Sequence, residues 1–379
     1  MNANDPIIDG WRAQVLDAAA QGRALTIRGG GSKDFYGGVA TGGAVLDTRA
    51  YAGVIDYEPT ELFITARSGT PLAEIEALLA GRGQIFPFEP PHFGAGATVG
   101  GVFAAGLSGP RRPSAGALRD YVLGARLLDG QGRVLRFGGQ VMKNVAGYDV
   151  SRMLAGSLGT LGLLLDVTLK LLPRPVEEAT LRFELTEDQA LALLNSWGGQ
   201  PLPISASAWE HGVLTLRLSG QRAAVQAARH RLGGEKLDDA GIFWQALREQ
   251  TATFFRPLAE GEALWRIGLP TTAPAFRLHA TAANARDGAA HGAQALGPQL
   301  IEWGGGQRWL HAPASAGPAL RAAATALGGH ATLFRGPDAA RAAGAFTHPG
   351  AALMRIHAGL KDEFDPKRVF NRARLFPEL

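Results

Sequence analysis

Clustered glycines are the sequence feature that most constrains how this chain can fold. Glycine accounts for 51 of the 379 residues, about twice the roughly 7% of an average protein. The glycines gather at 29–31, 94–109 and 156–162, between stretches patterned as strands and helices. Glycine accepts left-handed backbone and lets other groups approach closely. The clusters therefore predict sharp turns or close contact with a ligand, and they argue against flexible linkers.

The first two clusters lack the common nucleotide-binding motifs. Residues 29–33 read Gly-Gly-Gly-Ser-Lys, which has neither the Gly-Lys-Ser/Thr order of a P-loop nor a following helix. Residues 94–96 read Gly-Ala-Gly, without the third glycine of a dinucleotide fingerprint at the right offset. What remains is an anion nest, in which consecutive glycine N–H groups point at one pyrophosphate.

The second cluster leads through Thr98 into a predicted helix at 99–105. The positive N-terminus of a helix favours phosphate or a polarised ligand carbonyl. Tight turns and close helix packing would explain a single loop equally well, but two loops and a third Gly-Thr-Leu-Gly segment favour a large dinucleotide. If Gly30 is left-handed, alanine at this position should cost about 1–2 kcal/mol.

Several segments together resemble the p-cresol methylhydroxylase/vanillyl-alcohol oxidase type of FAD-binding domain. They occur in that family's order and cover roughly residues 20–175 and 353–379. The matching segments are 27–33, 97–109, 118–124, 143–150, 156–162 and the tail 360–371. The resemblance implies an α+β fold with two subdomains that hold FAD between them. The first two loops contain no His or Cys, so the resemblance implies noncovalent FAD.

The same resemblance implies a set of cofactor-binding residues in the glycine loops, in the segments that follow them and in the tail. These residues are Arg28, Gly29, Gly30, Gly31, Ser32, Lys33, Thr98, Val99, Gly100, Gly101, Ala105, Gly109, Asp120, Gly159, Thr160, Gly162 and Asn371.

The sequence Pro173-Arg-Pro175 predicts a domain boundary. We expect an FAD-binding domain at 1–175, a smaller lobe at 176–352 and a C-terminal segment, 353–379, that returns to the FAD domain. Beyond the boundary the pattern is strand, helix, strand, strand, helix, strand, which is typical of a ferredoxin-like α+β lobe.

The second lobe is shorter than in D-lactate dehydrogenase-like relatives. Their His-x-x-Asp-Gly-Asn-x-His motif is matched only at Asp287, Gly288 and His291. The short lobe and the stretch 112–116 are similar to the FAD-binding subunits of bacterial glycolate oxidase complexes. This resemblance implies oxidation of glycolate, a small 2-hydroxy acid, to glyoxylate, with a catalytic flavin subunit and an iron–sulfur subunit as partners. The chain has no cysteine, so another chain must ligate any iron–sulfur cluster.

Such chemistry needs a base for the hydroxyl proton and an arginine for the carboxylate. His291 is a candidate base, and Arg266 and Arg308 are candidate carboxylate ligands, although each can equally be an ordinary solvated side chain. Two alternatives stay open. One is a self-sufficient FAD-dependent 2-hydroxy-acid dehydrogenase of D-lactate type, and the other is a non-catalytic assembly subunit with a degenerate flavin fold.

Composition excludes several other classes. The net charge is +4 without a run of basic residues, which argues against nucleic acid. The histidines show no metal-binding spacing, so no metal site is expected. The most apolar stretch, 154–172, is interrupted by Asp166 and Lys170, so no direct membrane insertion is expected. We expect a cytoplasmic protein whose membrane association, if any, comes through partner subunits.

Overall fold

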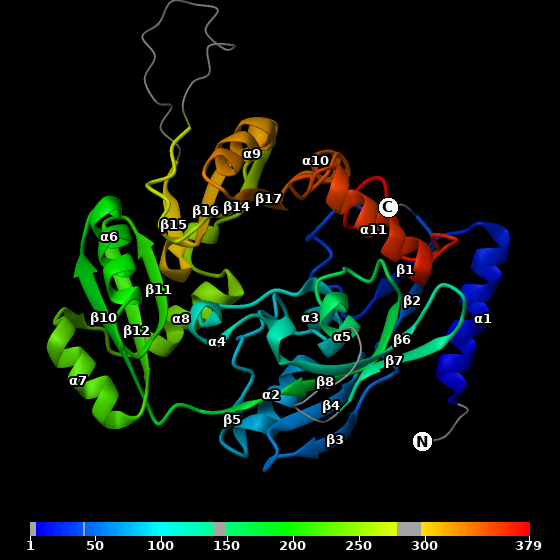
Figure 1. Ribbon diagram of the computed structural model, residues 1–379, viewed down its shortest axis with the longest axis horizontal. Coiled ribbons are helices and arrows are strands. Elements are labelled where there is room, and N and C mark those ends of the chain that lie inside the picture. The colour runs from blue at the N-terminus through cyan, green and yellow to red at the C-terminus, as the bar shows by residue number, and fades with distance from the viewer. Residues whose placement is uncertain (1–4, 41, 140–148, 279–296) are drawn as a thin grey trace, which may run out of the picture. The chain divides into compact units, whose positions relative to one another are not determined.

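The computed structural model describes residues 5–40, 42–139, 149–278 and 297–379 (Figure 1). It contains both helices and sheets, as the α+β prediction requires. The chain forms two compact units. The first comprises Met1–Gly109, Gly116–Arg174 and Ala342–Leu379, and the second comprises Pro110–Ala115 and Pro175–Arg341. These bounds differ from the predicted domains at 110–115, which belong to the second unit, and at 342–352, which belong to the first.

The first unit begins with helix α1 (Pro6–Gln21). The carboxylate of Asp5 caps this helix by accepting a hydrogen bond from the Ile7 amide (3.0 Å), and left-handed Gly22 ends it. Next come two parallel strands, β1 (Leu25–Arg28) and β2 (Ala44–Asp47). Apolar residues of α1 and these strands form one core with residues of a larger sheet.

The larger sheet of this unit has five antiparallel strands in the order β3-β4-β8-β6-β7. The strands are β3 (Val54–Glu58), β4 (Phe63–Arg67), β8 (Leu163–Lys170), β6 (Val122–Leu128) and β7 (Val134–Gly138). Helices α2 (Leu72–Ala80), α3 (Val99–Ala105) and α5 (Val150–Leu154) share a hydrophobic core with the sheet. The predicted helix at 99–105 is thus confirmed. Strand β8 ends at Lys170, and the two-residue strand β9 (Leu172–Pro173) follows it.

The C-terminal segment packs into both cores of the first unit. Helix α11 (Ala351–Phe364), red in Figure 1, contributes Phe364 to the core under the five-stranded sheet. The residues after it contribute Val369 and Phe370 to the core around α1. Sequence-distant parts of this unit are therefore held together by burial of apolar surface.

The second unit contains one eight-stranded sheet in the order β13-β10-β12-β11-β15-β16-β14-β17. Its strands are β10 (Glu177–Glu184), β11 (Ile204–Glu210), β12 (Val213–Gly220), β13 (Glu235–Lys236), β14 (Glu262–Gly268), β15 (Gln299–Glu302), β16 (Gln307–Pro313) and β17 (His330–Arg335). The first four strands follow the ferredoxin-like order, in which the fourth, first, third and second strands lie side by side. The last four strands repeat this order, and β11 pairs with β15 to join the two halves.

Helices accompany both halves of this sheet. They are α6 (Glu187–Gly198), α7 (Arg222–Leu232), α8 (Ala240–Glu249) and α9 (Gly317–Ala326). A capping box stands at the start of α6, where Thr186 and Gln189 exchange hydrogen bonds of 2.9 and 3.3 Å. The ferredoxin-like prediction therefore holds for the strand order, which both halves of the sheet share.

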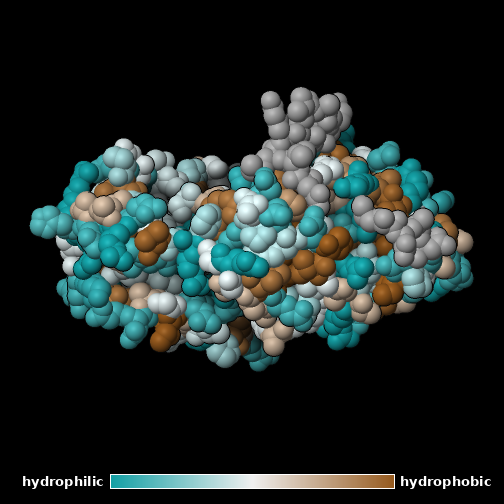
Figure 2. All heavy atoms as spheres, turned by 90° about the horizontal axis from the view of Figure 1, so that it is seen from below, coloured by the Kyte–Doolittle hydropathy of each residue, from teal (hydrophilic) through white to brown (hydrophobic). Residues whose placement is uncertain are grey.

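Among the described residues, no helix combines the length and the apolar character that a membrane span requires. Figure 2 shows one face of the molecule, on which apolar side chains lie in separate groups among hydrophilic ones.

Candidate functional site

The first two glycine loops lie against each other in the first unit. Gly30 packs on the backbone of Gly96 so closely that a Cβ at Gly30 would lie 1.5 Å from the Gly96 carbonyl oxygen. A Cβ at Gly29 would lie 2.4 Å from the Thr98 hydroxyl oxygen. The Lys33 ammonium of the first loop also donates to the carbonyl oxygen of His92 (3.1 Å), two residues before the second cluster. The two loops therefore lie together, which a dinucleotide-binding site formed by both of them requires.

The left-handed residue of the first loop is Gly31, with φ of 74°, and not Gly30. The condition on which the cost at Gly30 was predicted is therefore not met. What constrains Gly30 is its close packing on Gly96, whereas Gly31 is constrained by its backbone. A Cβ at Gly31 would also meet the guanidinium of Arg28 at 2.3 Å. That guanidinium is held beside the loop by an ion pair with Asp34 (2.8 Å).

The backbone amides of the first loop are available to a ligand. Among the residues that the structure describes, the N–H groups of residues 29–32 donate no hydrogen bond to the protein, and all four residues are partly exposed. Consecutive free amides in a turn with one left-handed glycine are the arrangement that binds a diphosphate. The loop thus fits the pyrophosphate of FAD.

The N-terminus of α3 does not offer its first amides to a ligand, contrary to the prediction from sequence. The Val99 amide donates to the Thr70 carbonyl (2.9 Å), and the Gly100 amide donates to the Ser68 carbonyl (2.8 Å). The Gly101 amide donates to the Thr98 hydroxyl (3.2 Å), which caps the helix. Residues 68–70 therefore accept hydrogen bonds from the first backbone N–H groups of α3, which a helix considered by itself would leave without partners.

Ser68 also lies in this region, although it belongs to no motif of the sequence. Its hydroxyl is buried without a hydrogen-bond partner among the described residues, and its Cβ lies 2.8 Å from where a Cβ of Gly100 would be. An orphaned buried hydroxyl beside a cofactor cradle is consistent with a bond to a bound ligand. No signal in the sequence distinguished Ser68 from other strand-end serines.

The third glycine segment packs on helix α3 of the second cluster through backbone hydrogen bonds. The Leu158 amide donates to the Ala104 carbonyl (2.9 Å), and the Gly156 amide donates to the Phe103 carbonyl (3.0 Å). Asn371 then ties this segment to the first loop: its side-chain oxygen accepts from the Ile27 amide (2.8 Å) and its amide donates to the Leu158 carbonyl (2.6 Å). Asn371 thus acts as a positioning residue that fixes β1 against the third segment.

Replacing Asn371 with alanine should lower the free energy of unfolding by about 2–3 kcal/mol, since it leaves two largely buried backbone groups without partners. FAD affinity should fall in parallel because β1 leads directly into the first loop. Urea unfolding and FAD titration of the apoprotein test both effects. Asn195→Ala is the matched control: it also removes two hydrogen bonds between an asparagine side chain and the backbone, but in the second unit. Equal FAD affinity in the two variants would contradict the positioning role.

Other residues implied by the resemblance have structural partners. The Asp120 carboxylate accepts from the Ala117 amide (2.8 Å) and so closes the turn before β6. The Gly109 amide donates to the Phe88 carbonyl (2.9 Å). Thr160 is buried and its hydroxyl donates to the Ser157 carbonyl (2.8 Å). A Cβ at Gly162 would meet the Leu127 side chain at 2.8 Å. These contacts explain the residue types without a ligand, and FAD contacts at these positions remain a prediction.

The two candidate arginines of the second unit point to opposite faces of its sheet. Arg266 pairs with Trp309 and Ile267 pairs with Arg308 in the β14–β16 register, and neighbouring residues of a strand face opposite sides. Arg308 is fully buried, and its guanidinium donates to the carbonyls of residues 273, 274 and 305. This geometry gives Arg308 a structural role, so the expectation that it binds a carboxylate is not supported.

Arg266 lies half-buried with its guanidinium 5.5 Å from the centre of the Phe334 ring. His330 on the adjacent strand β17 pairs with Gly268, and its ring packs against this glycine. Gly268 is two residues after Arg266 on β14. Desolvation by the surrounding chain, and then the positive charges of Arg266 and Arg112, lower the pKa of His330. No motif in the sequence singles out His330. His291 and the segment 140–148 lie outside the described residues.

The loops and the fold of the first unit define an FAD-binding flavoprotein. The profile of a family described as an FAD binding domain matches residues 11–138. The glycolate oxidase subunit GlcE of Escherichia coli (strain K12) is 46% identical over 97% of this chain and 96% of its own length. The chain therefore belongs to the family of this glycolate oxidase subunit, and FAD is its cofactor.

More distant relatives share about half of the chain or less. The glycolate oxidase subunit GlcD of Bacillus subtilis (strain 168) is 29% identical over 45% of this chain and 36% of its own. A D-lactate dehydrogenase of Archaeoglobus fulgidus is 29% identical over 52% of this chain and 44% of its own. The solved structure of alkyldihydroxyacetonephosphate synthase has the same fold, with a TM-score of 0.64 and 14% identity over 95% of this chain and 74% of its own.

Proposed function

We propose that this chain is an FAD-binding redox subunit of a glycolate-oxidising complex. In this proposal, glycolate is oxidised to glyoxylate and the electrons pass to an iron–sulfur subunit. The observation that carries the proposal is the 46% identity to the glycolate oxidase subunit GlcE, which extends over 97% of the chain and so includes both units. The absence of cysteine from all 379 residues supports an iron–sulfur centre in another chain.

The residues of the first unit account for how FAD would be held. The free amides of residues 29–32 suit its diphosphate, while Arg28 and Lys33 place positive charge beside that loop. Neither of the first two loops contains a His or Cys that could bond to the flavin, so we propose noncovalent binding. Bound FAD would supply the two-electron acceptor that a 2-hydroxy acid requires.

Arg266 is the residue that we propose for contact with the substrate carboxylate. It is half-buried on the sheet face opposite to that of Arg308, and it shares its surroundings with His330 and Arg112. A half-buried guanidinium binds a carboxylate more strongly than a fully solvated one, because water competes less for its donors. The base that would take the hydroxyl proton is not assigned.

Anaerobic flavin reduction tests the proposed function. The chain is purified alone and together with its co-expressed partner subunits, and glycolate or D-lactate is added while the visible flavin absorbance is followed. We expect glycolate to bleach the flavin only when the partner subunits are present. Bleaching of the isolated chain would instead show a self-sufficient dehydrogenase. A chain that binds FAD but shows no bleaching in any combination would point to a role in assembly.

A further inference from the structure

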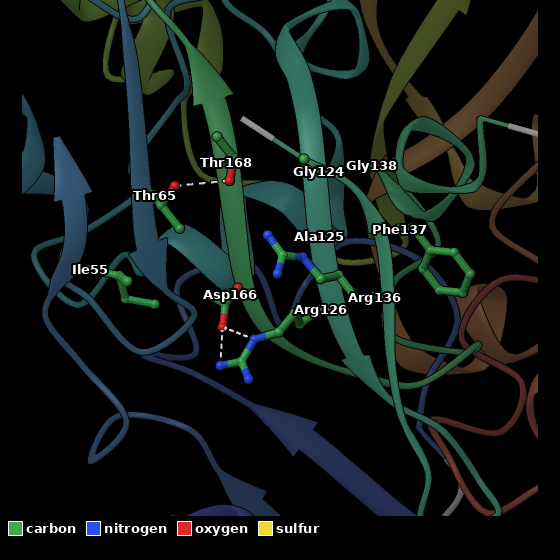
Figure 3. A pocket seen from close by; sticks show the side chains of 11 residues that line it. Ile55, Thr65, Gly124, Ala125, Arg126, Arg136, Phe137, Gly138, Asp166 and Thr168 are labelled. Atoms are coloured by element: carbon green, nitrogen blue, oxygen red, sulfur yellow. Dashed lines mark hydrogen bonds and ion pairs between the residues drawn. The ribbon is translucent and has the colours of Figure 1, made fainter. Parts of the chain in front are cut away.

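Part of the five-stranded sheet in the first unit exposes a polar face. The strand register places Arg67, Asp166, Arg126 and Arg136 side by side across β4, β8, β6 and β7. Residues paired in this way project from the same face of a sheet. Together with Thr65, Thr168 and neighbouring glycines, Asp166, Arg126 and Arg136 line a hollow in this face (Figure 3). We call it the arginine hollow.

The row contains three arginines and one carboxylate. Arg67 donates to the Ala52 carbonyl (3.1 Å), and its guanidinium lies 5.0 Å from the centre of the Tyr51 ring. Arg126 donates to the Asp166 carboxylate (2.6 Å) and to the Tyr51 hydroxyl (3.1 Å). Arg67 therefore contacts residues that do not line the hollow. Arg126 engages Asp166 and Tyr51 through Nε and Nη2, and its Nη1 makes no hydrogen bond within the described part of the chain.

Arg136 is the remaining arginine of the row. Within the described part of the chain it makes no hydrogen bond or ion pair. Its strand partner is Arg126, and like charges directly opposite each other on a sheet are destabilising. Figure 3 shows its side chain extending from β7 across β6 into the hollow instead of away from the sheet. A negative group in the hollow would convert this repulsion into attraction.

The rest of the lining also suits an anion. The hydroxyls of Thr65 and Thr168 are buried and bonded to each other at 2.9 Å. Each hydroxyl has one hydrogen, and one hydrogen serves this bond, so the other can donate to a ligand. Gly124 and Gly139 complete the lining, and the two backbones pack so closely that a Cβ at Gly124 would lie 2.8 Å from the Gly139 nitrogen.

We propose that the arginine hollow binds one oxyanion, a carboxylate or phosphate group, between Arg126, Arg136 and the threonine hydroxyls. The planar guanidinium of arginine matches both groups with paired hydrogen bonds. The oxyanion can be a free small anion or the acidic side chain of an associated protein chain. This site is separate in its residues from the proposed FAD loops and does not depend on which substrate the complex oxidises.

The first arm of the test uses the FAD-saturated chain, so that the glycine loops are already occupied. Thermal unfolding is followed against inorganic phosphate and against acetate at constant ionic strength. We expect stabilisation of the unmodified chain, and in Arg136→Gln an apparent affinity weaker by roughly tenfold, which corresponds to the loss of one charge-assisted contact. Without added anion, Arg136→Gln should melt at or above the temperature of the unmodified chain, since the repulsion with Arg126 is gone.

Arg182→Gln is the matched control. Arg182 is also an exposed strand arginine without a hydrogen bond or ion pair in the described part of the chain, but it belongs to β10 of the second unit. Its replacement should leave the anion response unchanged. An equal loss of response in Arg136→Gln and Arg182→Gln would show general charge screening and would overturn the site.

The second arm distinguishes an acidic side chain from a free anion. The chain is co-expressed with its partner subunits as Arg136→Glu or Arg182→Glu, and the retained complex is measured by size-exclusion chromatography. Loss of complex only with Arg136→Glu identifies a carboxylate of a partner chain as the oxyanion. Intact complex together with the phosphate response identifies a free anion. If neither arm responds to Arg136, the arginine hollow binds no oxyanion and the proposal is wrong, whatever the outcome with glycolate.

Discussion

Alanine at Gly30 is expected to weaken FAD binding by roughly tenfold to hundredfold. The added Cβ would lie 1.5 Å from the oxygen, 2.4 Å from the carbonyl carbon and 2.9 Å from the Cα of Gly96. All three atoms are backbone, so no flexible side chain can move aside and the two loops must separate. Overpacking of this kind typically costs about 1–3 kcal/mol, and each 1.4 kcal/mol corresponds to about tenfold in affinity. Quenching of flavin fluorescence during titration of the apoprotein measures the change.

Gly10→Ala is the control for this variant. Gly10 lies within α1, and a Cβ added there would meet no atom within 4 Å. Alanine is also the better residue inside a helix. This variant should bind FAD as the unmodified chain does and should be slightly more stable. If Gly30→Ala folds and binds FAD as tightly as Gly10→Ala does, the first loop does not form the cofactor site.

The contrast between Gly30 and Gly31 shows how far the sequence determined the site. The run of three glycines predicted a nest, and the free amides of residues 29–32 fit that prediction. The sequence did not show which glycine is left-handed, because the turn is set by contacts with residues far along the chain. Gly30 is constrained by Gly96, a partner that only the tertiary structure identifies.

The same reason explains which contacts of the candidate site residues the sequence did not predict. The predicted helix at 99–105 is present, since its pattern and its threonine cap are local signals. Its first amides are nevertheless used by Ser68 and Thr70, whose proximity depends on how β4 leads into α2. Arg266 and Arg308 look alike in sequence, and only the register of β14 with β16 reveals that they face opposite sides.

The domain boundaries illustrate a further limit. The two prolines at 173 and 175 are a local signal of a domain boundary, and the second unit resumes at Pro175. Residues 110–115 also contain two prolines, Pro110 and Pro113, but the sequence did not predict that this short segment belongs to the second unit. These residues include the short helix α4 (Arg112–Ala115). A hydrogen bond from the Ser114 hydroxyl to the Ser205 carbonyl (3.2 Å) holds this helix to β11. Contacts between residues so far apart along the chain leave no periodic trace in a single sequence.

A buried ion pair in the C-terminal segment should be the most sensitive point for the stability of the first unit. Lys361 and Asp365 are almost completely buried, with Nζ and Oδ2 2.7 Å apart. Lys361 also donates to the carbonyls of Thr160 (2.6 Å) and Phe370 (3.0 Å). The Asp365 carboxylate accepts from the amides of Val369 and Phe370, each at 2.8 Å. The ammonium and both carboxylate oxygens are therefore engaged.

Replacing either partner alone, as in Lys361→Met or Asp365→Asn, should lower the free energy of unfolding by about 3–5 kcal/mol, because the remaining charge is buried without its counter-ion. Urea unfolding at constant FAD concentration measures the loss. Lys367→Met is the control, since Lys367 is exposed six residues further on, and its replacement should change stability by no more than about 0.5 kcal/mol.

The pH dependence of Asp365→Asn distinguishes a lost charge partner from general damage to packing. Burial lowers the pKa of Lys361, and the Asp365 carboxylate opposes this shift, so the folded-state pKa should fall further in Asp365→Asn. The unfolded chain then binds more protons than the folded chain below the ordinary lysine pKa, and stability must rise with pH in that range. Asp365→Asn should therefore be closer in stability to the unmodified chain at pH 9 than at pH 7. Both pH values lie below the pKa of lysine in the unfolded chain, which is about 10.4. A deficit that is the same at both pH values would mean that the cost comes from packing and that Lys361 is not held as a buried cation.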